Sequence, residues 1–468
     1  MSIGRSTPAE QGIDPAGIAA FIDALERHPA IEPHGLVIQR NGVRVAEGCW
    51  RPHALHRARL LYSLSKTFTG TALALQLGEG RLRLDDLVSD YLPHAFEGAH
   101  PDFRALRIRH IASMATGHDH ETIGEAAALD PEGDVLRGFL RIPPAGPPGT
   151  VFAYNQPPVL ALATVLQQLA GERLVDYLRP RLFEPLGMGD VRSTQRAPGM
   201  DPGYTGVYAS LDAVARLGQL YLDDGVWEGR RILPEGWVAQ ASAMQVSNAA
   251  NSDPDWRTGY GFQLWRSRHG YRGDGASGQY MVVLPEQRMV VALLSCTEGM
   301  QRVLDLMWEH LLPALGVPRA AGPGDAALAD RLASLSLPTA QERHGGQAVT
   351  ALEGRFVPAA DAQVSHRTIT ALDAHERVLT LHEGEETMHL ALTPGWTDDA
   401  SGITATSAAQ LPDGSIAVDV VVLATPHRLE LRLDTRARTF TARWPVRPLF
   451  GAGIGRQLTA MRVPQLTA

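Results

Sequence analysis

The residues best suited to catalysis are a serine and, three positions later, the only lysine of the chain: Ser63 and Lys66. Lysine and arginine total 43, so the other 42 are arginines. A guanidinium keeps its proton in proteins, whereas a buried lysine amine can lose it. Lys66 is therefore a candidate neutral amine. The alternative is a leftover surface residue in a chain whose arginine bias reflects only a GC-rich genome.

The segment around this pair predicts a helix. From Tyr62 to Leu77 there is no proline, and apolar residues recur at helical spacing. Ser63 then lies at or near the helix start, with Lys66 one turn later on the same face and Ser65 pointing elsewhere. Free amides at a helix N-terminus stabilise developing negative charge. One turn would supply a nucleophile, a base and half of an oxyanion hole, unless Ser63 only caps the helix and Lys66 points to solvent.

The base role of Lys66 is energetically feasible. A serine hydroxyl is a weak nucleophile until a nearby base takes its proton. Lowering the pKa of a lysine from about 10.4 to about 7 costs roughly 4.6 kcal/mol. Full burial shifts a lysine pKa by about 3–5 units, which covers that cost.

Further motifs follow this pair in a specific order. Residues 35–48 read as two strands around an Asn-Gly hairpin turn, and the later motifs are RIRHIASMATG at 107–117, PGTVFAYN at 148–155 and PLGM at 185–188. Together with Ser-x-x-Lys, this set resembles the serine β-lactamase and penicillin-binding protein superfamily. It is most similar to the class C-like esterases, amidases and D-amino-acid peptidases, over about residues 10–315.

The resemblance implies a second catalytic residue, Tyr154. A phenol beside the lysine can relay the serine proton to the leaving group, although a tyrosine after a turn is often only a buried, hydrogen-bonded side chain. The usual triplet is Tyr-x-Asn, but here it reads Tyr154-Asn155-Gln156. The substrate-binding amide is therefore either Gln156, or Asn155 on a shifted backbone.

The third family element aligns with Gly273-Asp274-Gly275, where many members carry a Lys-Thr-Gly or His-x-Gly. The cation is missing unless Arg272 reaches into the cleft, which weakens the case for a β-lactamase. The x-x-Gly-x-x-Gly-Gln form resembles the nylon-oligomer-hydrolase branch. It implies that the amide of Ala276 is the second oxyanion donor, beside that of Ser63. Asp274 is a candidate for binding a substrate amine.

Two other motifs carry less weight. Gly273-x-Gly275-x-x-Gly278 matches a dinucleotide fingerprint, but residues 279–283 read as a strand rather than the required helix. His118-Asp119-His120-Glu121 contains metal-ligand types in a loop, and a solvated loop is favoured over a weak metal site. We expect no metal and no organic cofactor.

The pattern predicts an α+β class, with an antiparallel sheet flanked by helices and an inserted helical lobe as in β-lactamases, plus a C-terminal all-β domain. The expected parts are a catalytic domain at 1–315 with the lobe at about 70–255, a linker at 316–345 with a short helix around 325–334, and a β-sandwich or barrel at 346–468. Helices are expected at 15–27 and 300–315, and strands at 35–49, 279–283 and 289–295. Strands are also expected at 366–371, 377–381, 415–422 and 428–433. The β domain is a candidate for capping the cleft, forming a homodimer or stabilising the core.

Composition excludes several protein classes. The 468 residues carry a net charge of −8, which argues against binding of nucleic acid or an anionic membrane surface. Two cysteines give no disulfide framework, and no 18-residue apolar run or secretory signal is seen, so the cytoplasm is expected. The predicted function is a serine hydrolase that cleaves a small ester or amide through an acyl-enzyme. The alternatives are an inactive scaffold of the same fold, or a β-lactamase or D-aminopeptidase.

Overall fold

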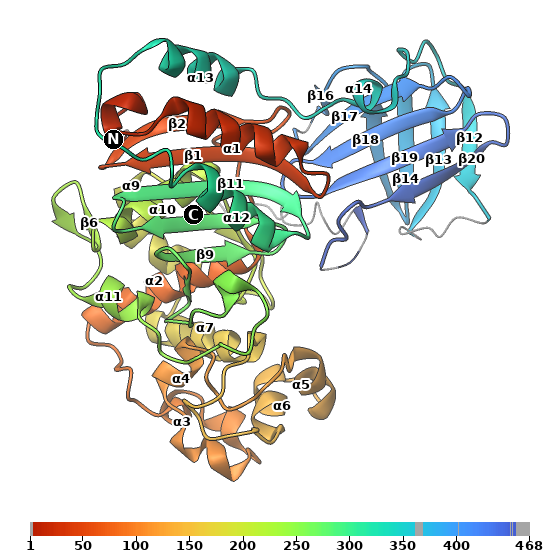
Figure 1. The fold of residues 1–468 in the computed structure, drawn as a ribbon. Coiled ribbons are helices and arrows are strands. Elements are labelled where there is room, and N and C mark those ends of the chain that lie inside the picture. The colour runs from red at the N-terminus through yellow and green to blue at the C-terminus, as the bar shows by residue number, and fades with distance from the viewer. Residues whose placement is uncertain (1–2, 361–367, 401, 450, 452, 455–468) are drawn as a thin grey trace.

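The computed structural model describes residues 3–360, 368–400, 402–449, 451 and 453–454. Its first part is built on a six-stranded antiparallel sheet in the order β2-β1-β11-β10-β9-β8 (Figure 1). The strands are β1 (Ile31–Arg40), β2 (Val43–Cys49), β8 (Trp265–Arg266), β9 (Tyr271–Gly275), β10 (Gln279–Leu284) and β11 (Met289–Thr297). The hairpin predicted at 35–49 is confirmed, as are the strands predicted at 279–283 and 289–295.

Both faces of this sheet are buried. Side chains alternate along β10 and β11, so that Tyr280 and Leu293 enter one core while Met281 and Ala292 enter the other. One face is covered by α1 (Pro15–Arg27), α12 (Met300–His310) and α13 (Pro323–Ala333), and the other by α2 (Ser65–Gly78) and α10 (Leu211–Leu222). Cover on both faces explains why these strands are almost continuously apolar. The helix predicted at 15–27 is confirmed, and the one predicted at 300–315 ends at His310.

The helical insertion fills the lower part of Figure 1, in orange and yellow. Its α-helices are α3 (Val88–Tyr91), α4 (Ile108–Ala112), α5 (Ile123–Leu129), α6 (Val135–Arg141), α7 (Gln156–Ala170), α8 (Leu174–Leu178) and α9 (Glu184–Leu186). The elements outside both the insertion and the six-stranded sheet are α11 (Trp237–Ser242) and the short strands β3 (Arg59–Leu60), β4 (Arg192–Ser193), β5 (Val207–Ala209), β6 (Val226–Trp227) and β7 (Arg230–Arg231). Although α10 falls within the predicted 70–255 lobe, it packs on the six-stranded sheet.

The C-terminal part is a second, nine-stranded sheet. Its strands are β12 (Gly354–Pro358), β13 (Ile369–His375), β14 (Val378–Glu383), β15 (Glu386–Ala391), β16 (Thr397–Asp398), β17 (Thr404–Gln410), β18 (Ile416–Val422), β19 (Arg428–Asp434) and β20 (Thr439–Arg443). The two ends of the sheet meet, because Ala408 N donates to Thr393 O at 2.7 Å and Thr406 Oγ1 to Ala391 O at 2.9 Å. The sheet thus curls toward a barrel around its apolar core.

The strands predicted in this part agree with β13, β14, β18 and β19, except that residues 366 and 367 lie outside the described residues. The stretch predicted as a linker carries α13, which packs on α1 and β2, and α14 (Ala340–His344), which packs on β17 and β18. The predicted α+β class with a C-terminal β-rich domain is confirmed. No helix among the described residues has both the length and the apolar character needed to cross a bilayer.

Candidate active site

Ser63 lies in a 3₁₀ turn, Tyr62–Leu64, between β3 and the start of α2. It therefore precedes the α-helix proper, close to the position that the sequence predicts. Tyr62 has a φ of +47°, a left-handed conformation that costs a bulky residue about 1–3 kcal/mol. Such strain persists only where the surrounding contacts hold it, so the turn that presents Ser63 is imposed by tertiary structure.

Lys66 is 2% exposed, and its amine points back toward the serine. The Nζ atom lies 3.0 Å from Ser63 Oγ, 2.8 Å from Gln156 Oε1 and 3.0 Å from the carbonyl oxygen of Tyr204. All three partners are uncharged. Ser65 points away from this group, and its Oγ accepts a hydrogen bond from Val207 N at 3.0 Å.

Burial lowers the pKa of Lys66 from its usual range to about 7. The carboxylates of Glu121 and Asp274 oppose this shift, because negative charge favours the ammonium form. A substantial fraction of the amine is therefore uncharged near neutral pH. An uncharged amine at hydrogen-bond distance from a hydroxyl can accept its proton.

Tyr154 completes the group around Ser63. Its hydroxyl is hydrogen-bonded to the Ser63 side chain, and its ring stacks on Trp265 with centroids 5.0 Å apart. Lys66 Nζ lies 4.7 Å from the centre of the Tyr154 ring. Burial, with a further contribution from Asp274, raises the pKa of the phenol. The phenol therefore stays protonated, and of the two side chains only the lysine is suited to act as the base.

The two amides after Tyr154 have different environments. Gln156 Oε1 accepts the hydrogen bond from Lys66, whereas Asn155 is buried and its Oδ1 accepts from Thr122 N and Thr122 Oγ1, both at 3.0 Å. Of the two alternatives that the sequence leaves open, the structure places Gln156 at the site. Asn155 instead ties α7 to the segment before α5.

Strand β9 passes very close to the nucleophile turn, which explains its glycines. A Cβ atom on Gly275 would lie 2.0 Å from Leu61 O, and one on Gly273 would lie 2.2 Å from Thr67 Oγ1. At Gly275 the obstructing atoms belong to the backbone, so a side chain there would require the nucleophile turn to move. The close approach brings Ala276, at the end of β9, to the same side of the fold as Tyr62, against which it packs.

The turn after β9 is held by Gln279. Its Nε2 donates to the carbonyl oxygens of Ser277 at 3.1 Å, Ser295 at 2.8 Å and Ala276 at 3.3 Å. Ser277 has a φ of +64°, so this second turn is also left-handed at a residue with a side chain. Both segments predicted to carry oxyanion donors are thus tightly constrained.

The model of the Beta-lactamase family matches residues 32–315, which is more than half of the chain. The chain belongs to the Beta-lactamase family. It is 27% identical over 274 residues to penicillin-binding protein 4 of Amycolatopsis lactamdurans, covering 50% of this chain and 70% of that protein. It is 24% identical over 313 residues to the 6-aminohexanoate-dimer hydrolase of Paenarthrobacter ureafaciens, covering 62% and 79% respectively.

The fold is also similar to the octameric penicillin-binding protein homologue from Pyrococcus abyssi, with a TM-score of 0.54 and 16% identity. That match covers 89% of this chain and 98% of the other, so it extends into the nine-stranded sheet. The predicted family and fold are confirmed, and the protein is a serine hydrolase of this family.

The β9 segment of this family member does not place a free cation in the cleft. Arg272 is fully buried, and its Nε donates to Asp274 Oδ2 at 2.9 Å. Its Nη1 donates to Asp255 O, Arg266 O and Ser267 Oγ, and its guanidinium lies 4.2 Å from the Trp256 ring centre. The suggestion that Arg272 reaches into the cleft is therefore wrong. Asp274 is already ion-paired with Arg272, and its role in binding a substrate amine stays a prediction.

Sequence reasoning missed two contributors to the site. Tyr204 supplies a backbone carbonyl to Lys66, which no side-chain pattern reveals. Glu121 belongs to the loop interpreted as merely solvated, yet its carboxylate accepts from Gln156 N at 3.1 Å and acts on the pKa of Lys66. Among the described residues, no three His, Cys, Asp or Glu side chains are grouped to hold a metal ion.

Proposed function

We propose that the protein hydrolyses a small ester or amide through an acyl-enzyme on Ser63, with Lys66 as base and Tyr154 as proton relay. The observation that carries the proposal is the buried amine of Lys66, 3.0 Å from Ser63 Oγ and with no carboxylate among its hydrogen-bond partners. An amine of this kind can take the serine proton, and no second base is needed.

The reaction divides into two halves. Ser63 Oγ bonds to the carbonyl carbon as its proton passes to Lys66 Nζ, and the oxyanion is held by the amides of Ser63 and Ala276. The carbon–leaving-group bond then breaks, and Tyr154 passes the proton from Lys66 to the departing oxygen or nitrogen. Water attacks the acyl-enzyme with the same groups in reverse order. The acid is released and Ser63 regains its proton.

The charge of the site narrows the substrate class. Arg272, the cation nearest in sequence to the oxyanion segment, is neutralised by Asp274 and buried behind it. Among the described residues, β9 offers a β-lactam carboxylate no free counter-ion, so we propose neutral or cationic esters and amides ahead of β-lactams. Esters are the more readily hydrolysed, because an ester carbonyl is less stabilised by resonance than an amide carbonyl and an alkoxide leaves more easily than an amide anion.

The test is covalent labelling with a fluorescent fluorophosphonate, followed by mapping of the labelled peptide. Label on Ser63 that is lost in Ser63→Ala is expected. Ser65→Ala is the matched control, because Ser65 lies two positions away and its hydroxyl is bound to Val207 N. If the folded wild-type protein takes up no label, or takes up label only on another residue, the inactive-scaffold alternative is favoured. A panel of p-nitrophenyl esters, D- and L-aminoacyl amides and nitrocefin then ranks the substrates.

A further inference from the structure

The C-terminal domain touches the segment that leads into the nucleophile turn. The loop between β18 and β19 lies against β3, where Leu60 N donates to Ala424 O at 2.8 Å and Arg59 Nη2 to Thr425 O at 3.3 Å. Ala424 also joins a small buried cluster with Leu60 and Tyr62, and Ala276 packs on this cluster. One loop of the second domain is therefore in contact with the segment that leads into Ser63, and it contributes to the cluster on which Ala276 packs.

The closest polar contact of this loop is with Tyr62 itself. Tyr62 Oη and His427 Nε2 are 2.5 Å apart, and His427 Nδ1 lies 3.1 Å from Val446 O. A carbonyl can only accept, so Nδ1 carries the ring hydrogen and Nε2 accepts the hydrogen bond of the phenol. Burial lowers the pKa of His427 to about 4, which keeps the ring neutral and this arrangement intact. The backbone of Leu449 is a second hydrogen-bond partner of the Tyr62 hydroxyl.

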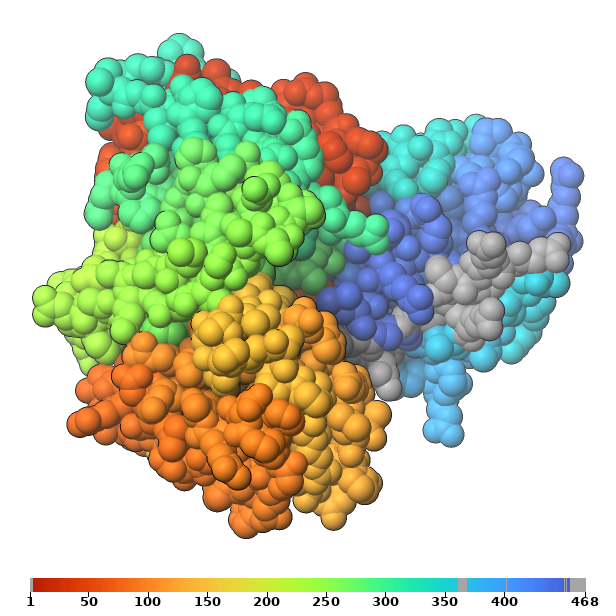
Figure 2. All heavy atoms as spheres, turned by 60° about the horizontal axis from the view of Figure 1, so that its bottom comes forward, coloured from red at the N-terminus to blue at the C-terminus, as the bar shows by residue number. Residues whose placement is uncertain are grey.

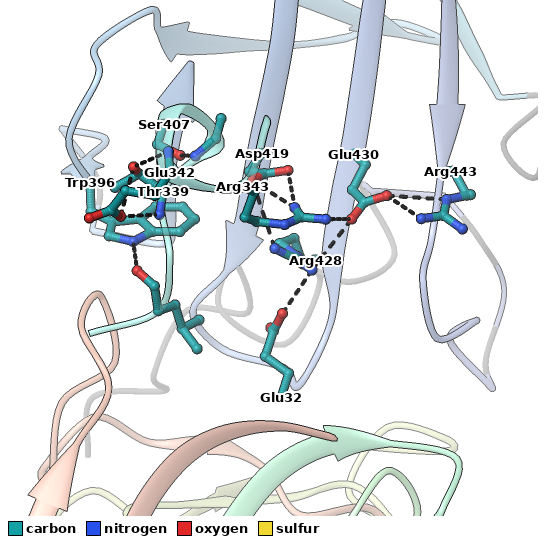
Figure 3. Close-up of polar contacts among 12 residues, drawn as sticks. Glu32, Thr339, Glu342, Arg343, Trp396, Ser407, Asp419, Arg428, Glu430 and Arg443 are labelled. Carbon is teal, nitrogen blue, oxygen red and sulfur yellow. Dashed lines mark hydrogen bonds and ion pairs between the residues drawn. The ribbon is translucent and has the colours of Figure 1, made fainter. Parts of the chain in front are cut away.

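Ion pairs fix the loop that carries His427. Arg428 Nη2 lies 2.9 Å from Glu32 Oε2 on β1, across the boundary between the two domains (Figure 3). Behind it, Arg343 contacts Asp419 and Glu430 at 2.8 Å and 2.6 Å. Each of these side chains is about one-fifth exposed or less. Partly buried ion pairs that are connected to one another hold their geometry better than isolated surface pairs. In the space-filling view, the blue C-terminal residues lie directly against the first domain (Figure 2).

Tyr62 is the residue whose left-handed backbone precedes Ser63. A side chain anchored at its hydroxyl cannot rotate freely, so the anchor favours the strained turn over a relaxed one. On the basis of the proposed function, we infer that His427 is a positioning residue, which holds Tyr62 and through it the oxygen and amide of Ser63. The C-terminal β domain then contributes to catalysis by fixing the geometry of the active site.

The test is a double-mutant cycle with Tyr62→Phe and His427→Leu in the full-length protein. Each single variant should lower kcat and the rate of fluorophosphonate labelling by about tenfold, with KM changed less than twofold, because the loss is in the geometry of attack. The double variant should be no slower than the slower single variant, since both remove the same contact. Tyr62→Phe keeps the shape of the ring, so it remains informative if His427→Leu folds poorly.

The matched control is Trp396→Phe. Trp396, labelled in Figure 3, donates from Nε1 to Leu337 O at 2.8 Å and so joins the same two parts of the chain, and Leu337 belongs to a different apolar cluster from that of Tyr62. This variant should keep kcat and the labelling rate within twofold of wild type. Wild-type kinetics in Tyr62→Phe, additive losses in the double variant, or an equal loss in Trp396→Phe would each overturn the inference. Absence of label on Ser63 in the wild-type protein would instead overturn the proposed function beneath it.

Discussion

Two buried basic residues stand on neighbouring elements of this protein, Lys66 on α2 and Arg272 on β9, and their environments differ in charge. Arg272 is fully buried with a carboxylate at 2.9 Å and three further acceptors. Lys66 is just as deeply buried, but its three hydrogen-bond acceptors are all neutral. The first arrangement stabilises a permanent charge, whereas the second makes the charge costly and favours loss of a proton.

This difference explains the choice of residue at each place. A guanidinium stays charged when buried and therefore needs Asp274, while an amine escapes the same cost by becoming neutral. In a chain with 42 arginines, the one lysine stands where the proposed mechanism requires a proton to move. Four changes would break or sharpen the comparison.

The largest effect is expected from Lys66→Arg, which replaces the titratable cation by a permanent one. We expect kcat/KM for a p-nitrophenyl ester to fall by about 10³-fold or more, because the base is lost. Lys66→Met should lose a comparable amount, and circular dichroism would check that both variants fold. Substantial activity in Lys66→Arg would contradict the mechanism.

Asp274→Asn removes the partner of the buried guanidinium. We expect a loss of about 3–5 kcal/mol in the free energy of unfolding, measured in urea, since Arg272 is left as an unpaired buried charge. The midpoint of the pH–rate profile should also move to lower pH, because Asp274 raises the pKa of Lys66.

Asp212→Asn is its matched control. Asp212, on α10, is a buried carboxylate that pairs with Arg216 and with Arg44 on β2, which is the edge strand at the opposite end of the sheet from β9 and β8. Asp212→Asn should lower the free energy of unfolding about as much as Asp274→Asn does, without moving the midpoint of the pH–rate profile. A shift of the profile in both variants would show that the effect is not specific to Asp274.

Lys66→Met should make the inactive protein more stable at neutral pH. Because burial lowers the pKa of Lys66 to about 7, folding carries a cost that is full below pH 7. That cost falls as pH rises toward the unfolded value of 10.5, since only the unfolded chain binds the proton in this interval. The variant also loses the hydrogen bonds of the lysine amine, which offsets part of this gain. We expect a net gain of about 2 kcal/mol in the free energy of unfolding at pH 7, and a smaller gain toward pH 10. A gain that does not depend on pH would contradict a depressed pKa.

The smallest effect is expected from Glu121→Gln. In the wild type, kcat/KM should rise with pH through an apparent pKa of about 7, because the neutral amine is the active form. Removal of the Glu121 charge should lower this midpoint by a few tenths of a unit, since an exposed carboxylate is largely screened. Glu125→Gln, an exposed change near the same loop, should leave the midpoint unmoved, and salt should erase the difference between the variants.

Local pattern was enough to predict part of the fold. Helix α1, the β1–β2 hairpin, β10, β11 and the later strands were expected close to their observed bounds, because periodicity and turn residues act over a few positions. The position of α10 was not predicted, because an apolar helix has the same sequence pattern whether it packs in a lobe or on a sheet. Which of Asn155 and Gln156 faces Lys66 was also undecided, because both are amides at adjacent positions.

The sequence by itself determined the chemistry available: one serine, one lysine three residues later and a tyrosine within family motifs. Only the tertiary structure decided their states. The pKa of Lys66 depends on burial and on the charges of Glu121 and Asp274, and its amine is held by Tyr204 and Gln156, all of which come from distant segments. The left-handed turn at Tyr62 likewise depends on contacts some 365 positions along the chain. Solvation and strain are properties of an assembled environment, so no local pattern specifies them.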